Sequence, residues 1–150
     1  MTPHKSLLFQ SAFELSFFLL GFFNISKKDL EKINLAQDLP TLLKNTTSVL
    51  TTSDSGSGIG YSSIRVRGSD QSRVNVTING VPYNDSESMS VYWVNLPDFA
   101  SSIESIQIQR GVGTSTNGSA AFGGSVNIQT NAASEEALFE INNTLGSFNT

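Results

Sequence analysis

The sequence predicts a small α+β domain in which short strands and turns predominate over helices. Apolar residues recur at every second position in several short runs, which is the spacing of a strand that buries one face of a sheet. Ser, Asn, Thr and Gly together make up two fifths of the chain, a composition that favours turns and short strands over long amphipathic helices. With 150 residues, the chain has the size of one ordinary domain or of a piece of a larger protein.

The chain begins with an apolar segment, residues 1–23, that we separate from the domain. Its apolar run, Leu15–Phe23, is shorter than the about 20 residues that a helix needs to cross a bilayer. The run is similar to the hydrophobic region of a secretory signal, but no cleavage pattern of small residues follows it. An unusual signal and the edge of a fragment both fit this segment, and we favour the fragment edge.

Two short helices are expected next, because helix-start signals precede apolar residues at helical spacing. Ser26 and Asp29 have the spacing of a capping box, and Asp38 followed by Pro40 marks a second start. The side chains expected on the buried sides of these helices are Leu30, Ile33, Leu39, Leu42 and Leu43.

Period-two alternation then predicts four strands. They lie around Ile64–Val66, Val74–Ile78, Ile106–Ile108 and Val126–Ile128, and a fifth alternating run spans Ala137–Asn142.

Turn signals separate the strands. The segment Thr51–Gly60 is so polar and glycine-rich that we expect an exposed loop, and Gly68–Ser72 is expected to close a hairpin. Asn79–Gly80 predicts a tight turn, with Pro82 preventing a central strand from continuing. Leu96–Phe99 is typical of a capped helical turn, and a glycine-rich loop spans Gly111 to Gly124.

Composition excludes several classes of function. A net charge of −4 argues against nucleic-acid binding, which needs a basic face. The chain has no cysteine, and its one histidine, His4, excludes a histidine-dependent triad or a multi-histidine metal site. We therefore expect no enzyme, no cofactor and no metal site.

Two motifs resemble ligand sites without completing them. Gly113–Gly118 has the glycine spacing of a phosphate loop but lacks the lysine that reaches the phosphates. Asn84, Asp85 and Glu87 could offer oxygen ligands to calcium, although a solvated acidic loop explains them better.

All four arginines lie in or beside the strand-like runs, whereas the lysines all precede the first of these runs. Arginine suits fixed bidentate contacts with carboxylates in partly buried interfaces. We therefore expect the polar faces of these strands to meet another charged surface that this chain does not contain.

Five short motifs in order resemble the plug domain of TonB-dependent outer-membrane receptors. They are Asp38–Pro40, Ile64–Gly68 after its Gly-rich loop, Val76–Pro82, Ile106–Gly111 and Gly123–Ile128. The resemblance implies a plug with a central mixed β-sheet and short helices, at residues 24–132. Residues 133–150 are similar to the first, truncated strand of the transmembrane β-barrel that follows the plug.

The resemblance also implies a function and partners. A plug sits in the lumen of its own β-barrel in the Gram-negative outer membrane, and the barrel is almost absent from this chain. It gates uptake of a scarce nutrient such as an iron–siderophore complex, cobalamin, haem or a glycan. The TonB–ExbB–ExbD complex supplies the energy by pulling on an N-terminal box, which we do not recognise here. The strand expected before Asn24 is replaced by the phenylalanine-rich run.

Site residues follow from the same resemblance. Ligand-facing loops would contribute Asp54, Tyr61, Tyr83, Asn84, Asp85, Glu87, Tyr92 and Trp93. Arg65, Arg67 and Arg110 match plug arginines that pair with carboxylates of the barrel wall. Trp93 is expected to be exposed and to contact ligand, because a tryptophan in a polar loop lacks a core role.

Two alternatives stay open. Short alternating strands with Gly, Ser and Asn turns also occur in secreted β-solenoid adhesins and glycan-binding or glycan-processing proteins, although no fixed repeat is visible. A periplasmic binding domain that stands alone is the other alternative.

Overall fold

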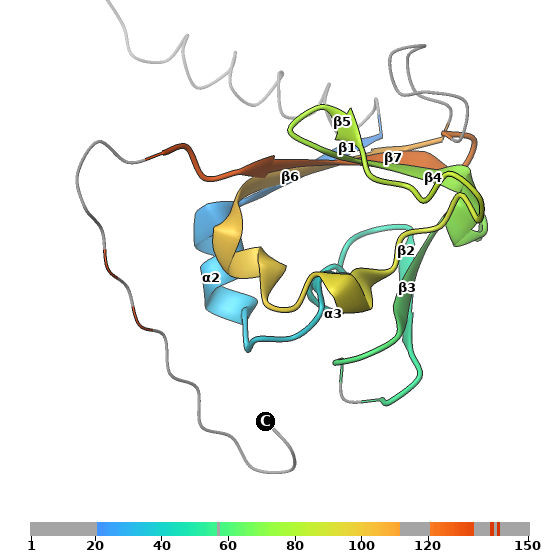
Figure 1. The fold of residues 1–150 in the computed structure, drawn as a ribbon. Helices are drawn as coiled ribbons and strands as arrows, with labels where there is room; N and C mark the ends of the chain where they lie inside the picture. Colours follow the sequence, from blue (N-terminus) through green and yellow to red (C-terminus); the bar gives the residue numbers. More distant parts are fainter. Residues whose placement is uncertain (1–20, 57, 112–120, 134–138, 140, 142–150) are drawn as a thin grey trace, which may run out of the picture.

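The domain is a five-stranded mixed sheet with short helices and a separate two-stranded sheet on one of its sides (Figure 1). The computed structural model describes residues 21–56, 58–111, 121–133, 139 and 141. The predicted α+β class and the central mixed sheet are therefore confirmed, and a stacked β-solenoid is wrong. No helix within the described ranges is long and apolar enough to cross a membrane.

The large sheet has the strand order β1-β6-β7-β4-β5. β6 (Ile103–Arg110) lies antiparallel to β1 (Phe22–Ser26) on one side and to β7 (Gly124–Thr130) on the other. β7 then pairs in parallel with β4 (Val74–Ile78), and β5 (Val81–Pro82) completes the opposite edge. All four predicted strands are present among these elements and β3.

The face of the large sheet that looks toward the helices forms the core. Ile106 of β6 lies opposite Ile128 of β7, Ile108 lies opposite Val126, and all four side chains are fully buried. Burial of a side chain of this size contributes about 1.5–3 kcal/mol. This set of cross-strand pairs is the centre of the hydrophobic cluster.

The two helices follow their predicted start signals, with one difference. α3 (Leu39–Leu42) buries its leucines as expected, and α2 (Lys27–Ile33) buries Leu30. Ile33, however, is 40% exposed, because α2 ends there and the Asn34 N–H bonds back to the Leu30 carbonyl.

The capping box at the start of α2 is also modified. The Ser26 hydroxyl accepts no backbone N–H and instead donates to the Asp29 carboxylate at 2.7 Å. The hydroxyl is therefore used to hold Asp29, which lies in the first turn.

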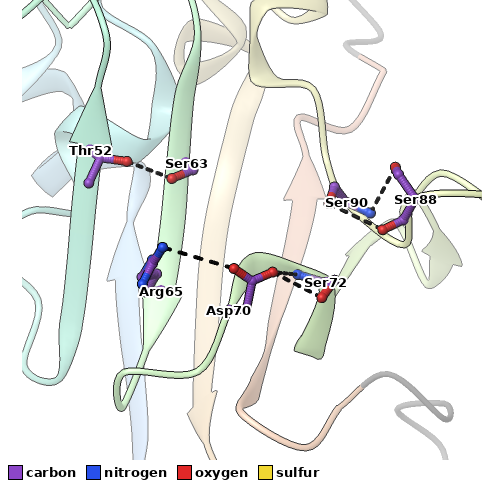
Figure 2. A network of polar contacts seen from close by, with 7 residues as sticks. All are labelled: Thr52, Ser63, Arg65, Asp70, Ser72, Ser88 and Ser90. Atoms are coloured by element: carbon purple, nitrogen blue, oxygen red, sulfur yellow. Dashed lines mark hydrogen bonds and ion pairs between the residues drawn. The ribbon is translucent and has the colours of Figure 1, made fainter.

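The small sheet overturns the prediction that Thr51–Gly60 is an exposed loop throughout. β2 (Val49–Ser53) pairs antiparallel with β3 (Ser62–Val66), so the polar segment predicted as a loop begins with strand residues. β-branched Thr51 and Thr52 suit an extended edge, and the Thr52 and Ser63 hydroxyls lie 2.6 Å apart across it (Figure 2). Within that loop Gly58 is buried, because its carbonyl accepts the Asp38 N–H at 2.8 Å.

Gly68–Ser72 does not close a hairpin, since β3 and β4 belong to different sheets. Arg67 and Gly68 both have positive φ angles, and the Ser69 N–H bonds to the Val66 carbonyl, so the chain leaves β3 in a tight turn. Asp70 then caps the 3-10 helix η1 (Gln71–Arg73) by accepting the Ser72 N–H, and this directs the chain into the large sheet.

Other predicted turns are confirmed. Asn79 and Gly80 have φ angles of 51° and 81°, the combination of a type I′ turn between β4 and β5. Pro82 lies in an edge strand, where its missing N–H costs no ladder bond. The 3-10 helices η2 (Trp93–Asn95) and η3 (Phe99–Ser102) precede β6. The capped turn predicted at Leu96–Phe99 differs, because η3 begins only at Phe99 and the Asp98 side chain does not cap it.

The first strand is present rather than replaced. β1 starts at Phe22, inside the phenylalanine-rich run, because pairing with β6 uses main-chain groups that any side chain allows. Phe23 is 39% exposed and so is not a core residue. Residues 1–20, most of the loop from Gly111 to Gly124 and most of the alternating run Ala137–Asn142 lie outside the described residues.

We predict that Ile108→Val destabilises the domain by about 0.5–1.5 kcal/mol, because it removes a fully buried methyl group. The matched variant Ile59→Val, at a side chain 51% exposed, should change stability by less than about 0.5 kcal/mol. Urea unfolding at constant slope measures both, and equal shifts would contradict the core described above.

Candidate functional site

The residues predicted to face a ligand lie in two separate places. Asp54 and Tyr61 are at the tip of the β2–β3 hairpin, and the others lie between β5 and the first residue of η2, Trp93. β5 and the β2–β3 hairpin lie on different sides of the domain (Figure 1), so the two groups belong to separate segments of the fold. η2 packs beside β3, which brings Tyr92 toward the small sheet.

The hairpin tip is closed by its own backbone. The Asp54 N–H donates to the Tyr61 carbonyl at 3.0 Å, which leaves both side chains exposed, Tyr61 to 65%. The tip therefore offers an aromatic ring and a carboxylate to a partner outside the domain.

Asn84 is a structural residue rather than a free ligand contact. Its amide oxygen accepts the Val76 N–H at 2.7 Å, and its amide nitrogen donates to the carbonyls of Val74 and Met89 at 2.9 and 2.8 Å. The Asn84 side chain thus pairs with the backbone of β4 much as a neighbouring strand would. Leaving these buried groups unpaired would cost about 1–3 kcal/mol each.

Asp85 closes the loop that follows. Its carboxylate accepts the Ser88 N–H at 2.7 Å, the Ser88 hydroxyl at 2.9 Å and the Glu87 N–H at 3.1 Å. The Ser88 N–H and hydroxyl stabilise the charged form and lower the pKa of Asp85. Its Oδ1 accepts all three of these bonds within the loop, whereas the Glu87 side chain is exposed.

The expectation that Trp93 is exposed is wrong. Its side chain is only 2% exposed, because the turn of η2 directs the indole into the hydrophobic cluster. Val91 and Trp93 are both buried while Tyr92 between them is 47% exposed, so the sequence does carry a period-two signal here. The polar residues upstream hide that signal.

Three exposed apolar side chains lie close in sequence to the tyrosines, and they are not among the site residues predicted from the sequence. Ile59 lies at the hairpin tip beside Tyr61, Met89 lies in the β5–η2 loop, and Val94 follows Trp93; each is at least one third exposed. Each of the two segments therefore exposes an aromatic and an apolar side chain: Tyr61 with Ile59 at the hairpin tip, and Tyr92 with Met89 and Val94 near η2.

The arginines gather at the end of the large sheet where β6 ends and β7 begins. Arg110 is the last residue of β6, and the Arg67 guanidinium covers Gly111, where a Cβ would lie 2.8 Å from its Nη1. Arg73 ends η1, and its carbonyl accepts the Gly123 N–H just before β7. Within the described part of the chain, no carboxylate lies within ion-pair distance of these three side chains.

Arg65 differs from the others because it has an acidic neighbour. Its Nη2 lies 4.0 Å from the Asp70 carboxylate, and both side chains are about half exposed (Figure 2). Such a surface pair contributes about 0–1 kcal/mol, so Arg65 remains available to another partner. Hydrogen bonds from the Ser72 N–H and hydroxyl lower the pKa of Asp70 and keep it charged.

Among the described positions, the polar face of the large sheet is neutral except for the exposed Glu104, which lies in β6 at the bulge between Ile103 and Ser105. Alternation places there Asn24, Gln107, Gln109, Ser125, Asn127, Gln129, Asn75 and Thr77. The Thr77 hydroxyl donates to the Asn127 side chain at 2.8 Å. Arg110 shares the register of Ile106 and Ile108, so the expectation that the arginines lie on polar strand faces holds for Arg65 but is wrong for Arg110.

The fold and sequence both match a known family. Residues 23–125 match the TonB-dependent Receptor Plug Domain, so the chain belongs to that family, which is one of transporters and not of enzymes.

Among individual relatives, the chain is 32% identical over 123 residues to the vitamin B12 transporter BtuB of Vibrio cholerae, which covers 82% of this chain and 20% of BtuB. It is 31% identical over 127 residues to the probable TonB-dependent siderophore receptor PirA of Acinetobacter baumannii, which covers 78% of this chain and 17% of PirA. The chain thus spans about one fifth of the relatives it matches.

Solved structures agree. The crystal structure of PirA from Acinetobacter baumannii superimposes with a TM-score of 0.60 at 29% identity, over 78% of this chain and 18% of PirA. The copper transporter OprC gives the same TM-score at 16% identity over 77% of this chain and 18% of OprC, which supports the fold alone.

We predict that Ser88→Ala raises the pKa of Asp85 part of the way back toward 3.8, because it removes the hydroxyl donor and keeps the N–H donor. The folded pKa is lowered, so this stabilisation is present above the unfolded value and is lost as pH falls through the folded one. An NMR titration of the Asp85 carboxyl carbon measures the shift. Ser86→Ala is the matched control, and an unchanged pKa in Ser88→Ala would contradict the described loop.

Proposed function

We propose that this chain is the plug of a TonB-dependent transporter, seated in the lumen of its own β-barrel in a Gram-negative outer membrane. The observation that carries the proposal is the family match over residues 23–125 together with the plug fold of the same residues. In this role the domain closes the barrel until TonB, energised by ExbB and ExbD, acts on it and lets a nutrient pass.

The polar face of the large sheet, neutral except at Glu104, supports a plug that moves. Amides and hydroxyls can exchange their hydrogen bonds with water at small net cost, whereas a large apolar interface would have to be torn open. The apolar residues of the sheet are used instead in the internal core.

We propose an iron–siderophore complex as the ligand, contacted by the exposed residues Asp54, Tyr61, Tyr83, Glu87 and Tyr92. Asn84 and Asp85 would shape the loop, and the buried Trp93 would support it from inside. The siderophore receptor PirA supports this ligand class, and the match to BtuB makes a cobalamin the competing outcome of the test.

We further propose that Arg65, Arg67 and Arg110 pair with carboxylates of the barrel wall. The support is geometric: Arg67 and Arg110 converge near Gly111 at the end of the sheet, with no acidic partner among the described residues. Arg67 is exposed and Arg110 is partly exposed, and guanidinium groups without a carboxylate partner in the described residues favour an acidic surface.

For the ligand, we predict that Tyr61→Ala and Tyr92→Ala in the full-length receptor each weaken binding of a ferric siderophore about tenfold, because each removes an exposed aromatic contact. Ile33→Ala, an exposed side chain of α2 away from these loops, is the control. Equilibrium binding and TonB-dependent uptake of radiolabelled iron in iron-starved cells are measured side by side. Uptake of labelled cyanocobalamin alone would reject the siderophore, and uptake that persists without TonB would reject the transporter.

For the arginines, we predict that Arg67→Ala in the full-length receptor makes the plug several times more sensitive to protease, because it removes a charge-assisted contact with the wall. Lys28→Ala, an exposed cation on α2, should leave the digestion rate unchanged. Equal digestion of the Arg67 variant and the parent receptor would contradict the proposed pairing.

A further inference from the structure

Arg110 is bonded to the point where the chain enters the first strand. The Gly21 carbonyl accepts two hydrogen bonds from this one residue, from the Arg110 backbone N–H at 3.0 Å and from Nε at 3.2 Å. Gly21 itself is buried and has a φ angle of 76°, a conformation that suits glycine. The start of β1 is therefore fixed by a side chain as well as by the sheet ladder.

The same guanidinium also reaches the small sheet. Its Nη1 donates to the Ser48 hydroxyl at 3.5 Å, and the Ser48 carbonyl accepts the Arg67 N–H at 2.9 Å. A planar guanidinium can hold both contacts at once because its donors are fixed in a fork. We call Gly21, Ser48 and Arg110 the Arg110 junction; it joins the start of β1, the start of β2 and the end of β6.

Apart from this junction, β1 is held weakly. Among the residues that the structure describes, it is an edge strand whose one partner strand is β6. Ile25 is its single buried side chain, whereas Phe23, Asn24 and Ser26 are exposed. Few buried contacts and a solvent-facing edge are the properties of segments that open separately from the rest of a domain.

We propose that Arg110 is the positioning residue that keeps β1 closed on the sheet, and that β1 opens as a separate unit when the Arg110 junction breaks. The role of Arg110 in holding β1 does not depend on the proposed function; only its consequence for movement of the plug rests on that function. A force applied on the N-terminal side of β1 acts on the bonds of Gly21. Breaking the junction releases the Arg110 guanidinium from Gly21 and Ser48, and we assign this same group to the barrel wall. Opening of β1 and loosening of the plug would then be one coupled event.

Native-state hydrogen exchange on the 150-residue chain tests the junction directly. We expect Arg110→Gln to speed exchange of the β1 amides about tenfold, the effect of losing one hydrogen bond from a charged donor, and to leave the β4 and β7 amides unchanged. Arg110→Lys should behave like Arg110→Gln, because an ammonium group lacks the fork that holds Gly21 and Ser48 together. Arg73→Gln, at an arginine of the same sheet end outside the junction, is the control.

A cross-link separates the opening of β1 from general unfolding. Asn24 and Gln107 are register partners in β1 and β6, and the chain has no cysteine of its own. We therefore combine Arg110→Gln with Asn24→Cys and Gln107→Cys. Exchange of the β1 amides should be slow when the disulfide between the two cysteines is formed, and fast again when it is reduced.

Three outcomes would overturn the proposal: β1 amides as slow as those of β7 in the parent chain, no change in Arg110→Gln, or full rescue by Arg110→Lys. None of these readouts depends on transport. A full-length receptor that still takes up ligand with the cross-link oxidised would refute the coupling to uptake and leave the junction itself standing.

Discussion

The register of β6 against β7 is the constraint on which the rest of the domain depends. It places Ile106 against Ile128 and Ile108 against Val126 on the buried face, and Gln107 against Asn127 on the other. Because side chains alternate, a slip of one residue would put both glutamines of β6 into the core. The helices and the small sheet have a surface to pack on only in the observed register, and Arg110 reaches Gly21 and Ser48 only because β6 ends where it does.

Features fixed by neighbouring residues could be predicted from the sequence, whereas features fixed by distant partners could not. Asn79–Gly80 determines its own turn, and Asp38 with Pro40 starts α3 without outside help. The strand β2 was missed because its Thr and Ser residues show little hydrophobic alternation, and its extended form depends on β3. The hairpin expected at Gly68–Ser72 fails for a similar reason, since β4 finds its partner β7 about fifty residues away along the chain.

In the candidate site, too, some features could be predicted from the sequence and others could not. Exposure of Tyr61 and Tyr92 follows from their polar surroundings, and the structure agrees. Burial of Trp93 is not predicted because the polar composition of the loop favours exposure, although the alternation of Val91, Tyr92 and Trp93 indicates that Val91 and Trp93 share a buried side. Asn84 and Asp85 resemble ligand groups in sequence, but the Asn84 amide holds the loop to β4 and the Oδ1 of Asp85 holds the loop to itself. A polar side chain in a loop can serve the loop as readily as a ligand, and spacing alone does not separate the two uses.

The amides and hydroxyls that make up most of the polar face of the large sheet have a physical consequence of their own. Hydrogen bonds among neutral amides and hydroxyls are almost indifferent to ionic strength, whereas attraction between guanidinium groups and carboxylates is screened over about 8–10 Å in physiological salt. The domain therefore has two regions with different sensitivities to salt: the amide and hydroxyl positions of the polar face, and the sheet end that carries Arg67, Arg73 and Arg110. A change in salinity would act on the second region and leave the first nearly untouched.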